Sequence, residues 1–147
     1  MPLQQRRAEV IWEGNLVKGS GRVSVGTGVL KDSPVSWAAR TERPNGKTSP
    51  EELIAAAHAS CYAMALSNTL DKAGHPPTRL RINAVCSLEK IEGGIKIDAM
   101  DLEVAGVVPG VDQAEFQRLA EQGEKGCPVS NALRNNVKIV VKAKLRP

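Results

Sequence analysis

The feature that most constrains the fold is a stretch of eighteen residues, 53–70 (LIAAAHASCYAMALSNTL), without a formally charged side chain. Strong helix-start signals precede it. Ser49 suits the N-cap, Pro50 suits the first helical position, and Glu52 completes an S-x-x-E capping box. The sequence therefore predicts one long helix over residues 50–72.

A helix that is apolar on every side must be covered on every side. The chain has 147 residues, which fits a single domain, 1–147. One domain of this size covers about one face of such a helix, and the small Ala and Ser side chains permit close helix approach. We therefore expect a homodimer with helix 50–72 at its centre.

The remaining pattern is typical of an α+β fold, because strands, helices and strands follow one another along the chain. A first hairpin is expected from residues 4–13 and 21–25. The other expected segments are extended pieces around 29–30 and 35–39, strands 79–89 and 95–107, helices over 112–125 and 127–134, and a last strand, 137–145.

Composition excludes several function classes. The net charge is +4, but the basic residues are spread out and there are only four aromatic residues, so nucleic-acid binding is not expected. The apolar stretch approaches membrane-spanning length, yet His58, Ser60, Ser67 and Asn68 interrupt it, which favours a buried core helix. The first residues hold no apolar run typical of a signal peptide, and we expect a cytoplasmic protein.

The three cysteines have different surroundings. Cys127 stands in GCPVSN, where Pro128 predicts a helix start, so the thiol is either activated by the helix terminus or an inert cap. Cys61 lies mid-helix among apolar residues, where burial raises a thiol pKa and a structural role is expected from the residues alone. Cys86 fits a packing position in a strand.

Three other chemistries are compatible with individual residues but are not favoured by their surroundings. His58 lies one turn before Cys61, which allows a Cys–His nucleophile, but a hydrogen-bonded histidine at a helix interface is favoured. The CPVS motif is similar to a glutaredoxin C-x-x-S motif, but a helix rather than a strand precedes it. The histidines and cysteines are too dispersed for a zinc site.

Two motifs together resemble the OsmC/Ohr family of thiol-dependent hydroperoxide reductases: TSPEELIAAAHASC, 48–61, and GCPVS, 126–130. WEG, 12–14, and GTGVL, 26–30, extend the likeness over nearly the full chain and favour the osmotically inducible (OsmC) branch. The resemblance implies antiparallel sheets wrapping a long central helix in an intertwined homodimer.

The resemblance also implies roles for individual residues. Cys61 matches the peroxidatic cysteine, which becomes a sulfenic acid, and Cys127 matches the resolving cysteine, which then forms a disulfide with it. Glu51 matches a carboxylate ten residues before the first cysteine, although an acid in a first helical turn is also favoured by the helix dipole alone. Arg40 matches the arginine that stabilises the thiolate.

The activating cation and its subunit stay open at this point. In the Ohr branch an arginine lies in the first hairpin, where this chain has Lys18, with Arg22 nearby. Ten helical residues separate Glu51 from Cys61 by roughly 15 Å along one axis. Either the helix begins later than Pro50, or the carboxylate and its arginine reach Cys61 from a partner subunit, and we favour the second.

The expected activity is reduction of organic hydroperoxides, and more weakly of hydrogen peroxide, without metal, haem or flavin. Turnover would need an external dithiol, such as a lipoyl group. The alternative is a non-catalytic or redox-sensing dimeric binding protein.

Overall fold

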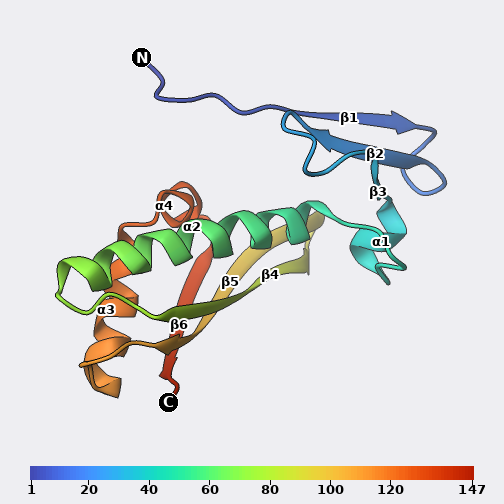
Figure 1. The fold of residues 1–147 in the computed structure, drawn as a ribbon. Coiled ribbons are helices and arrows are strands. Elements are labelled where there is room, and N and C mark those ends of the chain that lie inside the picture. Colours follow the sequence, from blue (N-terminus) through green and yellow to red (C-terminus); the bar gives the residue numbers. More distant parts are fainter. The chain divides into compact units, whose positions relative to one another are not determined.

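A computed structural model describes all residues, 1–147, and the chain divides into two compact units, residues 1–53 and 54–147. The elements are β1 (Ala8–Glu13), β2 (Ser20–Val25), β3 (Ser33–Val35), α1 (Trp37–Thr41), α2 (Pro50–Lys72), β4 (Arg79–Ile91), β5 (Gly94–Val107), α3 (Gln113–Lys125), α4 (Pro128–Leu133) and β6 (Lys138–Leu145) (Figure 1). The predicted mixture of helices and strands is confirmed. None of the helices is long and apolar enough to cross a membrane.

The first unit contains a three-stranded antiparallel sheet in the order β1-β2-β3. The turn after β1 is closed by Asn15, whose Oδ1 accepts a hydrogen bond from the backbone N–H of Lys18 at 2.8 Å. Strand β1 starts at Ala8 instead of residue 4. All of its side chains are exposed, including those of Ile11 and Trp12.

The expectation of extended chain over residues 35–39 is wrong, because most of this segment lies in α1. Ser36 is the N-cap, and its hydroxyl accepts a hydrogen bond from the backbone N–H of Ala39 at 3.1 Å. Two alanines and an arginine follow the cap, and these residues favour helix. The third strand, β3, forms just before this cap, and residues 29–30 lie in a loop.

Helix α2 has the predicted bounds, Pro50–Lys72. The Ser49 hydroxyl accepts from the backbone N–H of Glu52 at 3.1 Å, as an N-cap should. The reciprocal half of the capping box does not form, because the Glu52 carboxylate accepts from the Thr48 hydroxyl instead. The start at Pro50 excludes the alternative of a helix that begins later.

The second unit contains a sheet in the order β4-β5-β6. Strands β4 and β5 form an antiparallel hairpin, whereas β5 and β6 are parallel. The expectation of antiparallel sheets is therefore wrong for this last pair. Parallel strands need a long crossover connection, and the segment with α3 and α4 between the two strands provides it.

Helices α2 and α3 enclose the core of the second unit together with β5. Its buried side chains include Tyr62, Leu66, Leu70, Leu102, Val104, Phe116, Leu119 and Cys127. Close approach requires glycine at one point, because a Cβ on Gly106 would lie 2.5 Å from Cζ of Phe116. The Tyr62 hydroxyl donates to the backbone carbonyl of Ala120 at 2.8 Å, which ties α2 to α3 inside the core.

One side of α2 is buried within the second unit and the other is not. The buried positions recur every four residues and are His58, Tyr62, Leu66 and Leu70. On the opposite side of the helix Ser60 is exposed, and Met64 is 69% exposed. A single chain thus leaves an apolar face of this helix uncovered.

Candidate active site

The two cysteines of the predicted pair lie together in the second unit. Cys61 is in the middle of α2, and Cys127 is the N-cap of α4. Cys61 packs against the core cluster that contains Cys127, the Cys127 side chain acts on the Cys61 thiol, and no disulfide joins the two. Cys127 is fully buried, while Cys61 is half-buried against the core. The fold therefore brings the two reduced thiols into one neighbourhood of the second unit.

Burial raises the pKa of the Cys61 thiol above its ordinary value, as predicted from its apolar surroundings. A hydrogen bond from the backbone N–H of Val129 acts in the opposite direction and favours the thiolate. The hydrogen bond with the Cys127 side chain raises the pKa further. The surroundings of Cys61 in the second unit thus keep the thiol protonated unless a positive group is added.

The first turn of α4 supplies hydrogen-bond donors to both sulfurs. The backbone N–H of Val129 donates to Cys61, and the backbone N–H of Ser130 donates to Sγ of Cys127 at 3.5 Å. This arrangement follows from the sequence Cys-Pro, since Pro128 has no N–H and sets the first helical position. Two consecutive N–H groups of α4 are therefore directed at the two sulfurs.

His58 is fully buried, and its Nε2 lies 2.6 Å from the hydroxyl of Ser130, which is fully buried as well. Burial lowers the pKa of His58, although the nearby Glu124 carboxylate partly offsets this effect. The ring is therefore neutral at pH 7. The expectation of a hydrogen-bonded histidine at a helix interface is confirmed.

The first unit brings Arg40 and Glu51 together. Nε of Arg40 donates to both carboxylate oxygens, at 3.0 and 3.1 Å, and Nη2 donates to Oε2 at 2.9 Å. The Glu51 side chain is 9% exposed, and that of Arg40 is 29% exposed. A two-pronged contact of this kind fixes the plane of a guanidinium. None of these hydrogen bonds uses Nη1, so that group is left to donate to another acceptor.

The two alternative cations lie in the hairpin of the first unit. Arg22 forms an ion pair with Glu13 at 3.6 Å, with both side chains largely exposed. Lys18 is exposed in the turn. Neither is held as firmly as Arg40. The identity of the cation that serves Cys61 stays a prediction.

Comparison with known proteins identifies the family of the chain. The family model described as OsmC-like protein matches residues 43–142. The chain belongs to the OsmC/Ohr family. The resemblance seen in the two cysteine motifs is confirmed.

Individual relatives come from both branches of the OsmC/Ohr family. The chain is 39% identical to Peroxiredoxin OsmC of Escherichia coli (strain K12) over 132 residues, which are 90% of this chain and 92% of that protein. It is 36% identical to the Organic hydroperoxide resistance protein of Xanthomonas axonopodis pv. citri (strain 306) over 96 residues, 64% of this chain and 65% of that protein.

A solved OsmC/Ohr structure shares the fold. The crystal structure of the Organic Hydroperoxide Resistance Protein OhrB of Bacillus subtilis matches with a TM-score of 0.75 and 28% identity, and the match covers 94% of this chain and 98% of that one. The architecture described above is therefore that of the OsmC/Ohr family.

Sequence reasoning missed two contacts around Cys127 of this OsmC/Ohr protein. One is the role of Ser130 as the partner of His58. The other is the ion pair between Arg134 and the buried Glu124, 3.1 Å apart, which joins the ends of α3 and α4. The one sequence signal near these two contacts is the position of Ser130. It lies three residues after Cys127, which puts its backbone N–H over the capping sulfur.

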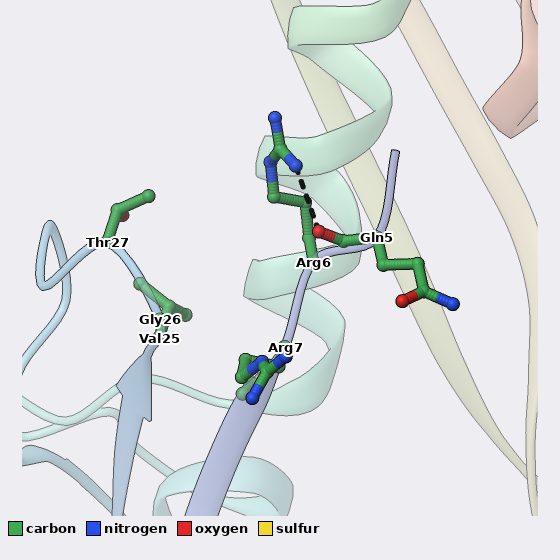
Figure 2. A pocket seen from close by; sticks show the side chains of 7 residues that line it. Gln5, Arg6, Arg7, Val25, Gly26 and Thr27 are labelled. Atoms are coloured by element: carbon green, nitrogen blue, oxygen red, sulfur yellow. Dashed lines mark hydrogen bonds between the residues drawn. The ribbon is translucent and has the colours of Figure 1, made fainter. Parts of the chain in front are cut away.

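Neither the hollows of the surface nor the metal-ligating side chains provide a further candidate for the active site. One open hollow of about 660 Å³ lies in the first unit and is lined by Gln5, Arg6, Arg7, Ala8, Val25, Gly26 and Thr27. Figure 2 shows the two arginine side chains there, with Arg6 donating to the backbone carbonyl of Gln5 at 2.9 Å. None of the predicted site residues lines it. No group of three or more His, Cys, Asp or Glu side chains is arranged to hold a metal ion.

Proposed function

We propose that this protein is a cysteine-based peroxidase that reduces organic hydroperoxides to alcohols. The observation that carries the proposal is that two thiols distant in the sequence, Cys61 and Cys127, lie together in one core. The names of its relatives, a peroxiredoxin and organic hydroperoxide resistance proteins, support the same chemistry.

In the first half-reaction the Cys61 thiolate attacks the terminal oxygen of the hydroperoxide. The O–O bond breaks, the alkoxide takes up a proton and leaves as the alcohol, and Cys61 becomes a sulfenic acid. In the second, the Cys127 sulfur attacks the sulfenic sulfur. The S–O bond breaks, and hydroxide leaves with the thiol proton as water. An external dithiol, such as a lipoyl group, reduces the resulting disulfide and is itself oxidised.

The proposal assigns Arg40 and Glu51 to activation of Cys61. A guanidinium near the sulfur would offset the effect of burial on the thiol and polarise the departing oxygen. The hydrogen bonds from Arg40 to the Glu51 carboxylate support this role, because they fix the guanidinium and do not use Nη1. We propose that a partner subunit supplies the pair, since α2 starts at Pro50 and holds Glu51 ten residues before Cys61.

A homodimer follows from the same reasoning. The exposed side of α2, with Met64, and the exposed strand β1 are apolar surfaces that a second copy would cover.

On its buried side Cys61 packs against a largely aliphatic core, which favours alkyl and aryl peroxides over hydrogen peroxide. Turnover needs a compartment in which the dithiol stays reduced, and we place the protein in the cytoplasm.

Dithiol-dependent consumption of tert-butyl or cumene hydroperoxide tests the activity in wild type, Cys61→Ser and Cys127→Ser. The first variant should be inactive. The second should complete one turnover and accumulate a sulfenic acid that dimedone traps. Full activity of Cys61→Ser would overturn the assignment of roles. Absence of peroxide consumption by wild type would instead favour a non-catalytic or redox-sensing binding protein.

Mixed dimers test the shared site. Cys61→Ala and Glu51→Ala subunits are each inactive as homodimers under this proposal. A mixed dimer should regain one intact site, because one subunit contributes the thiol and the other contributes the carboxylate. Mixed dimers without any activity, verified by light scattering to be dimers, would show that each subunit builds its own site.

A further inference from the structure

A buried polar pair joins the two helices that carry the cysteines. His58 lies on α2, one turn before Cys61, and Ser130 lies in the first turn of α4, three residues after Cys127. Both are fully buried, and the Nε2 to Oγ distance is 2.6 Å. Apolar packing alone would not need this pair, because burying polar groups is costly unless they are paired with each other.

The pair is isolated from the other polar side chains of the core. Nδ1 of His58 is buried and has no hydrogen-bond partner among the protein atoms, so Ser130 is the one side chain to which the ring is bonded. The carboxylate of Glu124 influences the ring through its charge, but it is bonded to Arg134. The hydrogen bond therefore links α2 directly to α4, beside the contacts that Cys61 makes with Val129 and Cys127.

The backbone of the same serine serves the resolving sulfur. The N–H of Ser130 donates to Sγ of Cys127, and the preceding N–H, that of Val129, donates to Cys61. Anchoring the Ser130 side chain to α2 therefore fixes the position of both donors relative to the two sulfurs. A rotation of α4 about its axis would remove both contacts and move Cys127 away from Cys61.

We propose that His58 and Ser130 are positioning residues that hold Cys127 against Cys61 for formation of the disulfide. The inference rests on the proposed peroxidase cycle and concerns its second half-reaction. In that step the sulfur–sulfur bond forms as the S–O bond of the Cys61 sulfenic acid breaks, and the Cys127 thiol proton leaves with the hydroxide as water. The pair itself gains and loses no proton over the step.

Ser130→Ala removes only the hydroxyl and is the main test. After one equivalent of cumene hydroperoxide, disulfide formation should slow by roughly tenfold to 10²-fold, because small misplacements of reacting groups cost rate on this scale. Formation of the sulfenic acid, followed by dimedone trapping and mass spectrometry, should slow much less. Ser130→Thr, which keeps the hydroxyl, should restore the rate of disulfide formation. Ser60→Ala is the matched control, because that hydroxyl is bonded only to backbone carbonyls of α2.

A double-mutant cycle separates this role from general loss of stability. His58→Leu should slow disulfide formation as Ser130→Ala does, and the double variant should be no slower than either single one, since all three lack the same hydrogen bond. An unchanged rate of disulfide formation in Ser130→Ala would overturn the proposal. Equal slowing of both half-reactions would do so as well. If His58→Leu does not fold, the comparison of Ser130→Ala with Ser130→Thr decides.

A test without peroxide keeps this inference separate from the proposed activity. Methyl methanethiolsulfonate converts the Cys61 thiol into a methyl disulfide, which Cys127 attacks with release of methanethiol. Ser130→Ala should slow this release relative to wild type. If wild type consumes no hydroperoxide, the proposed function fails, and this reaction still decides whether the pair positions Cys127.

Discussion

The Arg40 guanidinium meets the Glu51 carboxylate edge to edge, so that Nε and Nη2 both donate to it while Nη1 donates to neither oxygen. A lysine could keep the charge at this position, but it could not reproduce the planar, two-pronged contact. The orientation of the cation, and not its charge alone, is therefore the property that substitution should affect.

Arg40→Lys should lower kcat/KM for cumene hydroperoxide by roughly 10²-fold, because a mobile cation is poorly aligned with the sulfur and the leaving oxygen. Steady-state assays with an excess of dithiol measure this directly. Arg22→Lys is the control, since Arg22 is exposed and pairs loosely with Glu13. A loss in Arg22→Lys with normal activity of Arg40→Lys would transfer the activating role to the hairpin.

Oxidation should join Cys61 to Cys127 without unfolding, because the two thiols are already neighbours in the reduced protein. One equivalent of peroxide should give a Cys61–Cys127 disulfide, identified by peptide mapping, with an unchanged far-UV circular dichroism spectrum. A large loss of helical signal on oxidation would show that α4 has to unwind before the bond forms.

Acidification should destabilise the protein through His58. Burial lowers its pKa in the folded state, so the unfolded chain binds a proton near pH 6.5, where the folded chain does not. The contribution of neutral His58 to stability is therefore fully present above about pH 6.5 and is lost as the pH falls below that value. Urea unfolding of wild type and His58→Gln across this range measures the effect. The variant should lose less stability on acidification, and equal losses would exclude His58 as the source.

Glu124→Gln should lower the free energy of unfolding by about 1–3 kcal/mol, because it removes the buried negative charge that pairs with the Arg134 guanidinium, while partial exposure of Arg134 limits the cost. Urea denaturation measures the change. Glu115→Gln is the comparison, because it breaks the exposed ion pair with Arg118. Its effect should be clearly smaller, and equal effects would mean that burial of Glu124 contributes nothing.

Gly106→Ala should destabilise the second unit by about 1–3 kcal/mol, since the added methyl group would overlap the Phe116 ring and force it to move. Gly94→Ala, where a Cβ meets no atom within 4 Å, should be tolerated. Thermal unfolding of both variants provides the comparison. A Gly106→Ala protein as stable as wild type would show that the ring shifts at no cost.

Local signals predicted the elements whose ends carry capping residues or glycines. Helix α2 follows from Ser49 and Pro50, and the hairpin of β4 and β5 follows from the Glu-Gly-Gly turn at 92–94. Helix α1 was missed because a five-residue helix gives no periodic pattern, and only its cap at Ser36 distinguishes it from extended chain.

Long-range pairings could not be derived from local patterns. The parallel contact of β5 with β6 depends on how α3 and α4 pack, and the pairing of Cys61 with Cys127 was suggested by resemblance to a family. The contact of His58 with Ser130 joins residues 72 positions apart, and the local sequence around either residue does not indicate the other as its partner.

The parallel placement of β6 beside β5 also determines the order in which the second unit can assemble. The hairpin of β4 and β5 needs only a short turn, whereas β6 can add to the sheet only after the intervening helical segment has closed a long loop. The native surroundings of Cys127, which lies in that segment, therefore arise late in folding. Refolding from denaturant should proceed fastest under reducing conditions, since a sulfur–sulfur bond made too early would trap the chain before its last strand is in place.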